Sequence, residues 1–371
     1  MRLLILPLIL LYSITSAQVT DSVNIQSVSD SLTIEIEMDS LTLIPLPDTV
    51  TTIGVGDIMM GTNYPEDRLP PDGGHFLMKG VEHILRDADM TFGNLEGVLL
   101  DSGGTPKQCK DPKVCYAFRS PVKYVEHLVS AGFDMVSLAN NHAGDMGEEG
   151  RLSSMKTLEN AGIRHAGQLS QKTAIFEKDG VTWGLVAFAP NANCVPLNDH
   201  AGARALVQHL DSLVDIVVVS FHGGAEGAKF QNVPRTEEMY YGENRGDVYK
   251  FSHMLIDAGA DIIFGHGPHV TRAVEVYNNR FIAYSLGNFC TYRGISINGV
   301  NGLAPIVKVF TDRKGDFIKA EITPTIQSYE RGVQIDETKQ VIKIIQDLSK
   351  KDFPESPVQI DDNGLITYLA N

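Results

Sequence analysis

Short clusters of residues that commonly bind metal ions recur along this 371-residue chain, and most of them stand where an apolar run gives way to a loop. Short apolar runs of this kind are typical of buried strands. In open α/β sheets, ligands bind beyond the carboxyl ends of parallel strands, so residues that recur at that point should converge in space. We therefore predict a hydrolytic site with two metal ions. The clusters are Asp57, residues 94–96, Asn141 with His142, His222, and residues 266–269.

The mixture of oxygen and nitrogen ligands decides which metals and which chemistry to expect. Such a mixture suits Mn, Fe or Zn better than Ca or Mg. Two such ions, about 3.5 to 4 Å apart, can hold a tetrahedral centre and lower the pKa of a bound water to about 7. We expect Glu96 to bridge the ions, with Asp57 on one ion and as a candidate second bridge. The predicted metal ligands are Asp57, Glu96, Asn141, His222, His266 and His269.

A proton donor for the leaving group is the other part that such a site needs. His142 follows Asn141 directly, and in a turn its ring would point away from the metal and toward the substrate. Imidazole titrates near neutral pH, so His142 is the candidate acid. Asp145 could orient this ring through a hydrogen bond. The alternative for Asp145 is a residue of the turn itself, which Gly144 and Gly147 also favour.

The elements that must position these residues alternate between strand and helix patterns from about residue 50 onward. Strands are expected near 52–56, 89–93, 133–138, 173–178, 182–189, 215–221 and 260–264, and helices near 76–86, 121–131, 149–161, 202–213 and 246–259. This alternation predicts an α/β sheet with parallel strands. After residue 270 the pattern gives strands only, near 272–277, 280–285, 303–310 and 317–323, before a last helix over 337–350. We expect these late strands to form a second set beside the first.

The first residues and the overall charge indicate where the chain acts. Residues 1–17 carry Arg2, an apolar stretch and then small residues, the pattern of an export signal, and the apolar stretch is too short to span a bilayer. Residues 18–50 are rich in Ser, Thr and Asp and are interpreted as a linker with one appended strand over 32–37. The mature chain is expected to have no transmembrane segment and to be periplasmic, on the cell surface or extracellular. A net charge of −15, without a basic face, argues against nucleic acid as a partner.

Four cysteines leave the pairing open. In an exported protein Cys109 and Cys115 could close a small disulfide loop, which we favour over two free thiols. Cys194 and Cys290 could pair or stay free. The sequence does not decide between these alternatives, and it does not indicate an oligomeric state.

Six strings in this chain resemble the CapA family of capsule or poly-γ-glutamate synthesis proteins, within the calcineurin-like metallophosphoesterase superfamily. The resemblance covers residues 51–289 and continues loosely to about 325. It implies a four-layer α/β/β/α sandwich of two mixed sheets flanked by helices, over a domain of residues 51–325, with a C-terminal helix and tail over 326–371. The strings lie at residues 56–59, 94–97, 137–142, 222–226, 265–270 and 284–289.

The resemblance places the six predicted ligands on metal positions of the superfamily and His142 on the position of the proton donor. This chain also departs from the superfamily pattern. The first motif, Asp-x-His, has Met59 in place of the histidine, and a thioether is a poor ligand for a hard divalent ion. Glu96 stands where the second motif has Asp, and two residues rather than one separate His266 from His269. The resemblance therefore implies one or two bound ions.

Two hypotheses from different classes follow. The first is an exported metal-dependent hydrolase or transferase that acts on an anionic envelope polymer or its precursor. The second is a non-catalytic factor for assembly or export of such a polymer, which keeps the fold. An acidic protein would need a metal or a local basic patch to bind a polyanion, and the sequence offers candidates for that patch in Lys229, Arg235, Arg245 and Arg272. The alternative is that these four are solvated surface charges.

Overall fold

The computed structural model describes residues 49–109 and 115–368. These described residues belong to one compact unit. The predicted signal peptide, and the strand expected over residues 32–37, lie outside the described residues. Residues 49 and 50, which the sequence placed in the linker, instead begin the first strand, β1 (Thr49–Met59). Val50 is buried in the core, and this burial explains why the strand starts earlier than the linker composition suggested.

The larger of two main sheets is mixed and has β1 near its middle. On one side β1 pairs in parallel with β2, which continues to β5 and β6. On its other side it pairs antiparallel with β16 and in parallel with the short β15. The remaining strands are β2 (Met90–Leu95), β5 (Met135–Ser137), β6 (Arg164–Ala166), β15 (Asn288–Thr291), β16 (Leu303–Asp312), β17 (Phe317–Ser328), β18 (Gly332–Ile335), β19 (Val358–Ile360) and β20 (Leu365–Tyr368).

The smaller main sheet is also mixed. Its central strands β8, β9, β12 and β14 run parallel, and antiparallel strands β7 and β13 close its two edges. Two strand pairs lie apart from both sheets: β3 (Val98–Leu99) with β4 (Arg119–Ser120), and β10 (Met239–Tyr240) with β11 (Glu243–Asn244). The strands of the smaller sheet are β7 (Thr173–Lys178), β8 (Val181–Phe188), β9 (Ile216–His222), β12 (Ile262–His266), β13 (Val274–Tyr277) and β14 (Arg280–Ala283).

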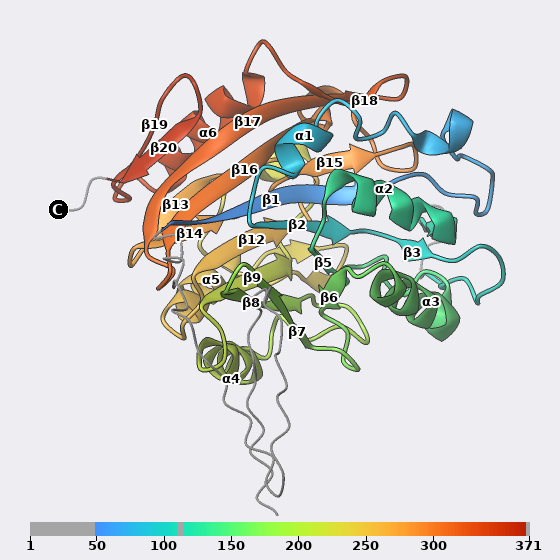
Figure 1. The fold of residues 1–371 in the computed structure, drawn as a ribbon, viewed down its shortest axis with the longest axis horizontal. Coiled ribbons are helices and arrows are strands. Elements are labelled where there is room, and N and C mark those ends of the chain that lie inside the picture. The colour runs from blue at the N-terminus through green and yellow to red at the C-terminus, as the bar shows by residue number, and fades with distance from the viewer. Residues whose placement is uncertain (1–48, 110–114, 369–371) are drawn as a thin grey trace, which may run out of the picture. The chain divides into compact units, whose positions relative to one another are not determined.

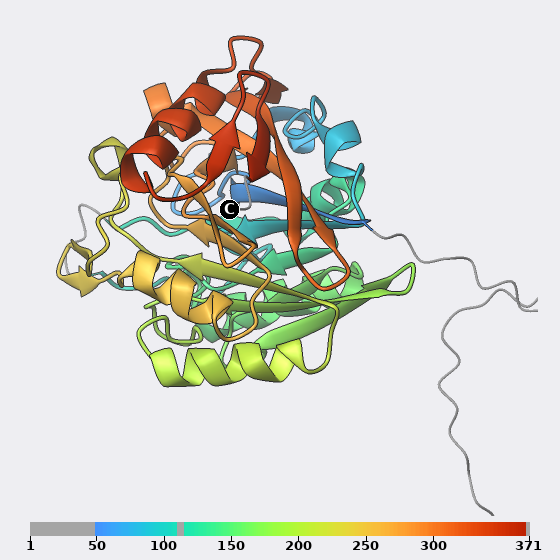
Figure 2. The ribbon, with the colours of Figure 1, turned by 90° about the vertical axis from the view of Figure 1, so that its left-hand side faces the viewer.

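The two sheets stack face to face with helices outside them, as Figures 1 and 2 show from two directions. The main core lies between the sheets, where Phe92 of β2 stacks on Phe264 of β12. Trp183 of β8 donates through Nε1 to Thr52 Oγ1 of β1 over 3.2 Å and so joins the sheets at full burial. A second core lies under α1–α3, and a third lies under α4 and α5. This is the predicted four-layer order of helices, sheet, sheet and helices, and the fold class is confirmed.

Most helices lie where the sequence predicts them, with one clear exception. The helix expected over residues 76–86 is limited to α1, because Leu77 O accepts a hydrogen bond from Val333 N of β18 instead of from its own helix. The N-termini of α4 and α5 are capped by the side chains of Asp199 and Asp247. The helices are α1 (Glu82–Leu85), α2 (Val125–Ala131), α3 (Gly147–Asn160), α4 (His200–Asp211), α5 (Val248–Ile256) and α6 (Gln340–Asp352).

The late strands do not form a set of their own, contrary to the expectation. β13 and β14 complete the smaller sheet, whereas β16 and β17 join the larger one beside β1. An unpaired edge of β1 would leave buried N–H and C=O groups without partners, and β16 satisfies them. The C-terminal region adds β18–β20 to this sheet, and α6 packs its Val341 and Ile345 into the main core. Over residues 49–109 and 115–368, none of the helices has the length and apolar character that a membrane crossing requires.

Candidate metal centre

Asp57 lies close to the carboxyl end of β1, at a point where three strands of the larger sheet meet. The pairing register sets it beside Asn94 of β2 and Asn288 of β15. Asn94 Nδ2 donates to Asp57 Oδ1 over 2.8 Å. The side chain of Asp57 is fully buried. A buried carboxylate needs such partners, because burial of an unpaired charge is costly.

The histidines come from the other sheet, and two of them contact this carboxylate. His222 and His266 end the neighbouring strands β9 and β12 and are opposite each other in the register. His266 Nδ1 lies 3.2 Å from Asp57 Oδ1, and His269 Nδ1 lies 3.0 Å from Asp57 Oδ2. The backbone of His269 is left-handed, with φ of 57°. Non-glycine residues rarely take this conformation, and when they do they are often at functional sites.

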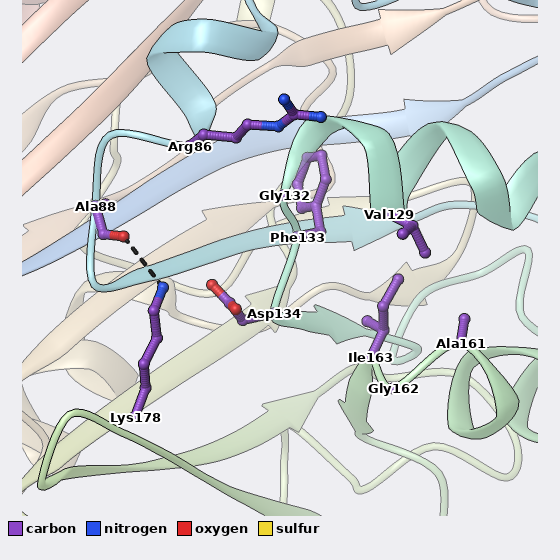
Figure 3. A pocket seen from close by; sticks show the side chains of 10 residues that line it. All are labelled: Arg86, Ala88, Val129, Gly132, Phe133, Asp134, Ala161, Gly162, Ile163 and Lys178. Atoms are coloured by element: carbon purple, nitrogen blue, oxygen red, sulfur yellow. Dashed lines mark hydrogen bonds between the residues drawn. The ribbon is translucent and has the colours of Figure 1, made fainter. Parts of the chain in front are cut away.

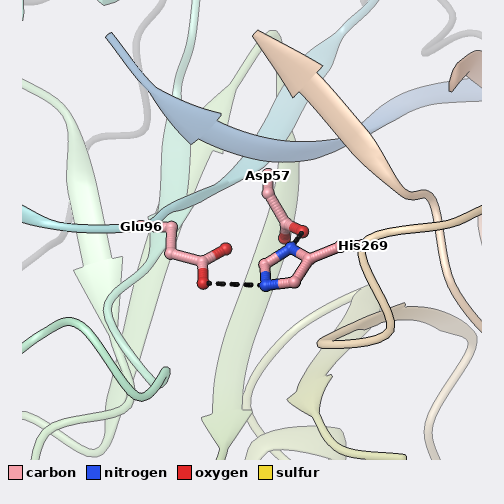
Figure 4. A group of neighbouring side chains, drawn as sticks. All are labelled: Asp57, Glu96 and His269. Carbon is pink, nitrogen blue, oxygen red and sulfur yellow. Dashed lines mark hydrogen bonds and ion pairs between the residues drawn. The ribbon is translucent and has the colours of Figure 1, made fainter. Parts of the chain in front are cut away.

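Asp57, Glu96 and His269 form the tightest group of ligand atoms (Figure 4). The imidazole of His269 lies between the two carboxylates, with its Nε2 3.7 Å from Glu96 Oε1. One ligand atom from each residue lies within 4.8 Å of the others, so this group could hold a metal ion. Glu96 directly follows β2. Gly267 lets the loops after β9 and β12 approach each other, because a Cβ at that position would lie 2.8 Å from Gly223 O.

Unpartnered ligand atoms around this group test whether a metal fits. Within the described residues, both carboxylate oxygens of Glu96 are buried without a hydrogen bond, and so are both ring nitrogens of His222. The same holds in that part of the chain for Asn141 Oδ1 and His266 Nε2. Native proteins rarely leave buried polar atoms unpaired, and each exception calls for an explanation. All six atoms are oxygen or imidazole nitrogen, which are the donors that Mn, Fe and Zn bind. The residues present therefore fit a metal.

The electrostatics of the group favour a cation between the carboxylates. Burial alone would raise the pKa of Asp57, but the bonds from His266 and His269 hold it below its usual range. Burial and the charge of Asp57 raise the pKa of Glu96 well above its usual range. Burial would lower the pKa of His269, yet Glu96 and Asp57 raise it to about 10. In the absence of a metal the carboxylates thus hold a proton on His269 where a cation could sit.

His142 and Asp145 form a second unit at the edge of the group. His142 Nδ1 lies 2.7 Å from Asp145 Oδ2, and its Nε2 faces Glu96 Oε1 at 4.0 Å. The ring stacks on Phe118, with centroids 4.2 Å apart. Asp145 is fully buried and accepts from Phe118 N over 2.6 Å. Burial lowers the pKa of His142, although Asp145 opposes this effect. Asp145 therefore contacts His142 as one of the two sequence hypotheses proposed.

Lys107 is a member of this unit that the sequence analysis missed. Its Nζ lies 2.6 Å from Asp145 Oδ1 and 3.3 Å from His142 Nδ1, and it donates to Asn141 O over 3.1 Å. Lys107 lies in the loop between β3 and β4, where no periodic pattern marks it. The disulfide between Cys109 and Cys115 closes the segment that follows. This pairing was the favoured alternative for these cysteines, whereas Cys194 and Cys290 are free and buried.

Three asparagines behind the ligands were not assigned a role from the sequence, although Asn94 lies in one of the predicted clusters. Asn140 Nδ2 donates to Asn94 Oδ1 over 3.0 Å, and Asn140 Oδ1 accepts from His142 N over 3.1 Å. Asn288 Oδ1 lies 3.1 Å from His269 Nδ1. These side chains link Asp57, His142 and His269 into one hydrogen-bonded network. The rule that found the ligands covers Asn94 and Asn140, near the end of β2 and in the loop beyond β5, but not Asn288, which begins β15.

The arginines that the sequence offered as candidates for a basic patch do not form one. Arg272 is fully buried and donates to both oxygens of Glu238, each over 2.8 Å. Arg235 pairs with Glu355 and lies over the ring of Tyr249. Carboxylates of the same chain neutralise the charges of these arginines, so they do not form a positively charged surface. Met59, which replaces the first histidine of the superfamily pattern, is buried near Gly97 and Gly294.

The two cavities described next lie away from the metal centre. One, of about 270 Å³, lies where β2, β5 and β6 begin, at the opposite end of the strands (Figure 3). Its charged groups are engaged: Lys178 Nζ donates to Ala88 O over 3.5 Å and Asp134 accepts from Thr91 N. Another, of about 330 Å³, lies beside the first turns of α4. Neither is lined by a predicted ligand.

Comparisons with known proteins agree with the sequence resemblance. Residues 51–293 match the family described as bacterial capsule synthesis protein PGA_cap. The capsule biosynthesis protein CapA of Bacillus anthracis is 27% identical over 261 residues, which are 65% of this chain and 59% of that protein. The PGA biosynthesis protein CapA of Bacillus subtilis (strain 168) is 30% identical over 256 residues, 65% of this chain and 63% of that protein. The chain thus spans less than two thirds of the length of these relatives.

Solved structures with similar folds have low sequence identity. The NAD nucleotidase of Haemophilus influenzae has a TM-score of 0.40 and 11% identity, over 78% of this chain and 53% of that one. A purple acid phosphatase from yellow lupin seeds has a TM-score of 0.40 and 11% identity, over 78% and 52%. Likenesses at these TM-scores say nothing about the chemistry. The family match covers more than half of the chain, and the chain therefore belongs to the bacterial capsule synthesis protein PGA_cap family, as its motifs predicted.

Proposed function

We propose that this protein is an exported, metal-dependent hydrolase or transferase that acts on a capsule or poly-γ-glutamate type polymer, or on a precursor of it. The family and the names of its relatives supply the polymer class. The observation that carries the reaction class is the group of Asp57, Glu96 and His269, surrounded by buried ligand atoms without partners. A chain that only needed a stable fold would gain nothing from leaving these atoms unpaired.

The residues that would hold metal divide between the two sheets. Asp57, Glu96 and Asn141 come from the larger sheet, and His222, His266 and His269 come from the end of the smaller one. A metal bound there would act as a Lewis acid on a phosphoryl or carbonyl oxygen and would lower the pKa of a water molecule. Asn94 and Asn288 orient the ligands through Asp57 and His269. One or two ions of Mn, Fe or Zn suit this donor set.

His142 is the residue placed to move a proton. Asp145 engages Nδ1, which leaves Nε2 on the side of Glu96, and stacking on Phe118 fixes the plane of the ring. A leaving group on that side could take a proton from Nε2, or give one to it. Lys107 and Phe118 N hold Asp145 in place, so the orientation of His142 depends on these two contacts of Asp145.

Elemental analysis of protein purified without chelator tests this proposal first. We expect one or two equivalents of Mn, Fe or Zn, which are lost in Asp57→Asn and in His266→Ala. Asp87→Asn and His209→Ala are matched controls, because both positions are exposed and lie outside the centre. Hydrolysis of a phosphodiester and of a γ-glutamyl peptide is then measured on the metal-loaded protein. Loss of turnover in the two site variants, and not in the controls, supports the proposal.

A non-catalytic assembly factor is the second candidate, and Met59 favours it. This residue takes the place of an imidazole in the superfamily pattern, which removes one ligand from the first motif. Under this hypothesis the protein turns over neither substrate, whether or not it holds metal. Wild-type protein without metal would contradict the first candidate and leave the second, which needs only the fold.

Export is a proposal that rests on residues 1–17. Fractionation of cells that produce the full chain, followed by N-terminal sequencing of the mature protein, tests it. Cleavage close to Ala17 in an exported fraction supports export, and an intact N-terminus in the cytosol contradicts it.

A further inference from the structure

Arg245 is held beside the metal centre by the backbone of a ligand loop. It directly follows β11, and its N–H donates to Glu238 O over 2.8 Å. Its carbonyl oxygen accepts from Gly224 N over 2.9 Å, and Gly224 comes two residues after the predicted ligand His222. The hairpin of β10 and β11 is therefore fastened to the loop that leaves β9. These backbone bonds keep Arg245 at a fixed position relative to the loop that carries His222.

The guanidinium of Arg245 is buried and has one edge engaged. Nη2 donates to Glu226 Oε1 over 2.9 Å, and Nε lies 2.5 Å from Glu243 Oε2. The side chain is only 7% exposed, and the ring of Tyr240 lies 5.7 Å from its central carbon. Nη1, which projects from the other edge of the planar group, is buried and meets no hydrogen-bond partner among the described residues.

The charged end of the side chain contacts the same ligand loop. Glu226, which accepts the hydrogen bond from Nη2, lies four residues after His222 in the chain. Both the backbone and the guanidinium of Arg245 therefore contact the loop that carries this predicted ligand.

A buried N–H group on a charged side chain needs an acceptor. Leaving such a donor unpaired costs about 1 to 3 kcal/mol or more. Arginine binds carboxylates and phosphates through its planar fork of donors. Glu226 and Glu243 balance its charge and fix the orientation of the fork. They do not use Nη1, so an acceptor from outside the chain can take it.

We propose that Nη1 of Arg245 binds an oxyanion of the substrate, a phosphoryl or a carboxylate oxygen, beside the metal centre. This inference rests on the proposed function and names the chemical class of group that the site accepts. Glu226 and Glu243 offset the charge of Arg245, so most of the electrostatic attraction for the oxyanion would come from the metal. The hydrogen bond from Arg245 would orient the oxyanion.

The other arginines named as candidates for a basic patch differ from Arg245 at their terminal nitrogens. Both terminal nitrogens of Arg272 donate to Glu238, and its buried atom without a hydrogen-bond partner is Nε. Arg235 binds Glu355 and the carbonyl oxygen of Asp352, away from the predicted ligands. Arg235 is thus a matched control: it is also paired with a glutamate and also lies over an aromatic ring.

Calorimetric titration of metal-loaded protein with orthophosphate, and separately with tri-γ-glutamate, tests the inference. We expect Arg245→Gln to weaken binding of at least one probe by about tenfold or more, the loss of one charge-assisted hydrogen bond. Arg235→Gln should bind both probes as the wild type does. Weakening with orthophosphate alone identifies a phosphoryl oxygen, and weakening with tri-γ-glutamate alone identifies a carboxylate.

The remaining outcomes separate this inference from the proposed function. If wild-type protein holds metal and binds neither probe, or if Arg245→Gln binds both as tightly as the wild type, the oxyanion site is refuted while the metal centre stands. If wild-type protein holds no metal, the proposed function fails, and orthophosphate binding to that protein still decides the role of Arg245. Should Arg245→Gln fail to fold, Arg245→Lys is measured in its place, because it keeps the charge and loses the fork.

Discussion

Metal binding to this centre should release the proton of His269. In the metal-free chain the pKa of His269 is raised to about 10, so its imidazole carries a proton at neutral pH. Burial and the charge of Asp57 raise the pKa of Glu96 well above its usual range, which adds to the competition between protons and a metal. A metal must displace the proton of His269, because only deprotonated side chains are ligands. Removing the proton of His269 near pH 7 costs about 4 kcal/mol, three pKa units at about 1.36 kcal/mol each.

The sign of the pH dependence follows directly. His269 is protonated below its pKa, so raising the pH removes a competitor and strengthens metal binding. The apparent dissociation constant should fall by about tenfold per pH unit between about pH 6 and about pH 8, because the proton of His269 is released. A site whose ligands are already unprotonated would show no such pH dependence.

Titration calorimetry with Mn²⁺ in two buffers of different ionisation enthalpy measures the proton count. We expect about one proton released by the wild type, and about one fewer by His269→Asn. His209→Asn, in the exposed last turn of α4, should match the wild type. Binding without proton release, or an affinity that does not change over this pH range, would refute the charge arrangement derived for Asp57, Glu96 and His269.

Three further predictions concern Lys107, Gly56 and Asp261. Lys107→Met leaves the buried Asp145 without its ion pair, so we expect a loss of about 1 to 3 kcal/mol in urea denaturation and a fall in turnover without loss of metal. Gly56→Ala would place a Cβ 1.9 Å from Gly287 O, so thermal unfolding should show a loss of at least about 3 kcal/mol. Burial raises the pKa of Asp261 to about 7, so the folded chain holds this proton more tightly than the unfolded chain, where the pKa is about 3.8. The contribution of Asp261 to the free energy of unfolding is therefore full below about pH 3.8 and falls by up to about 1.4 kcal/mol per pH unit until pH 7. Asp261→Asn should remove this slope in urea denaturation.

Each of these predictions has a control. Lys79→Met removes an exposed pair with Glu82 and should change stability little. Gly162→Ala meets no atom within 4 Å, and its positive φ should cost only about 1 kcal/mol. If the free energy of unfolding rises between about pH 4 and about pH 7, with the same slope in the wild type and in Asp261→Asn, other groups dominate the titration and the prediction for Asp261 is wrong.

The ligand positions could be predicted because one rule of sheet architecture governs them all. Buried strands in α/β proteins end at a common edge, so Asp57, His222 and His266 were recognisable from the apolar runs before them. The structure places His222 and His266 at strand ends and Asp57 two residues before the end of its strand. The order of layers was predictable for a related reason, since alternating strand and helix patterns leave few ways to bury both.

Features that depend on contacts between distant segments could not be predicted. Lys107 reaches Asp145 from a loop without periodicity, and the left-handed backbone of His269 depends on the turn around Gly267. The short α1 depends on Val333, which lies far along the chain and takes the carbonyl oxygen of Leu77. In these cases, tertiary hydrogen bonds overrode the local pattern.

The bond between Trp183 and Thr52 gives the protein an intrinsic optical probe. This chain contains a single tryptophan, and it is fully buried between the two sheets. Its fluorescence therefore reports on water entry between β8 and β1. No added label is needed, and no second tryptophan contributes to the emission. Emission and metal release can be followed in the same cuvette, which would show whether the ligands separate before the sheets do.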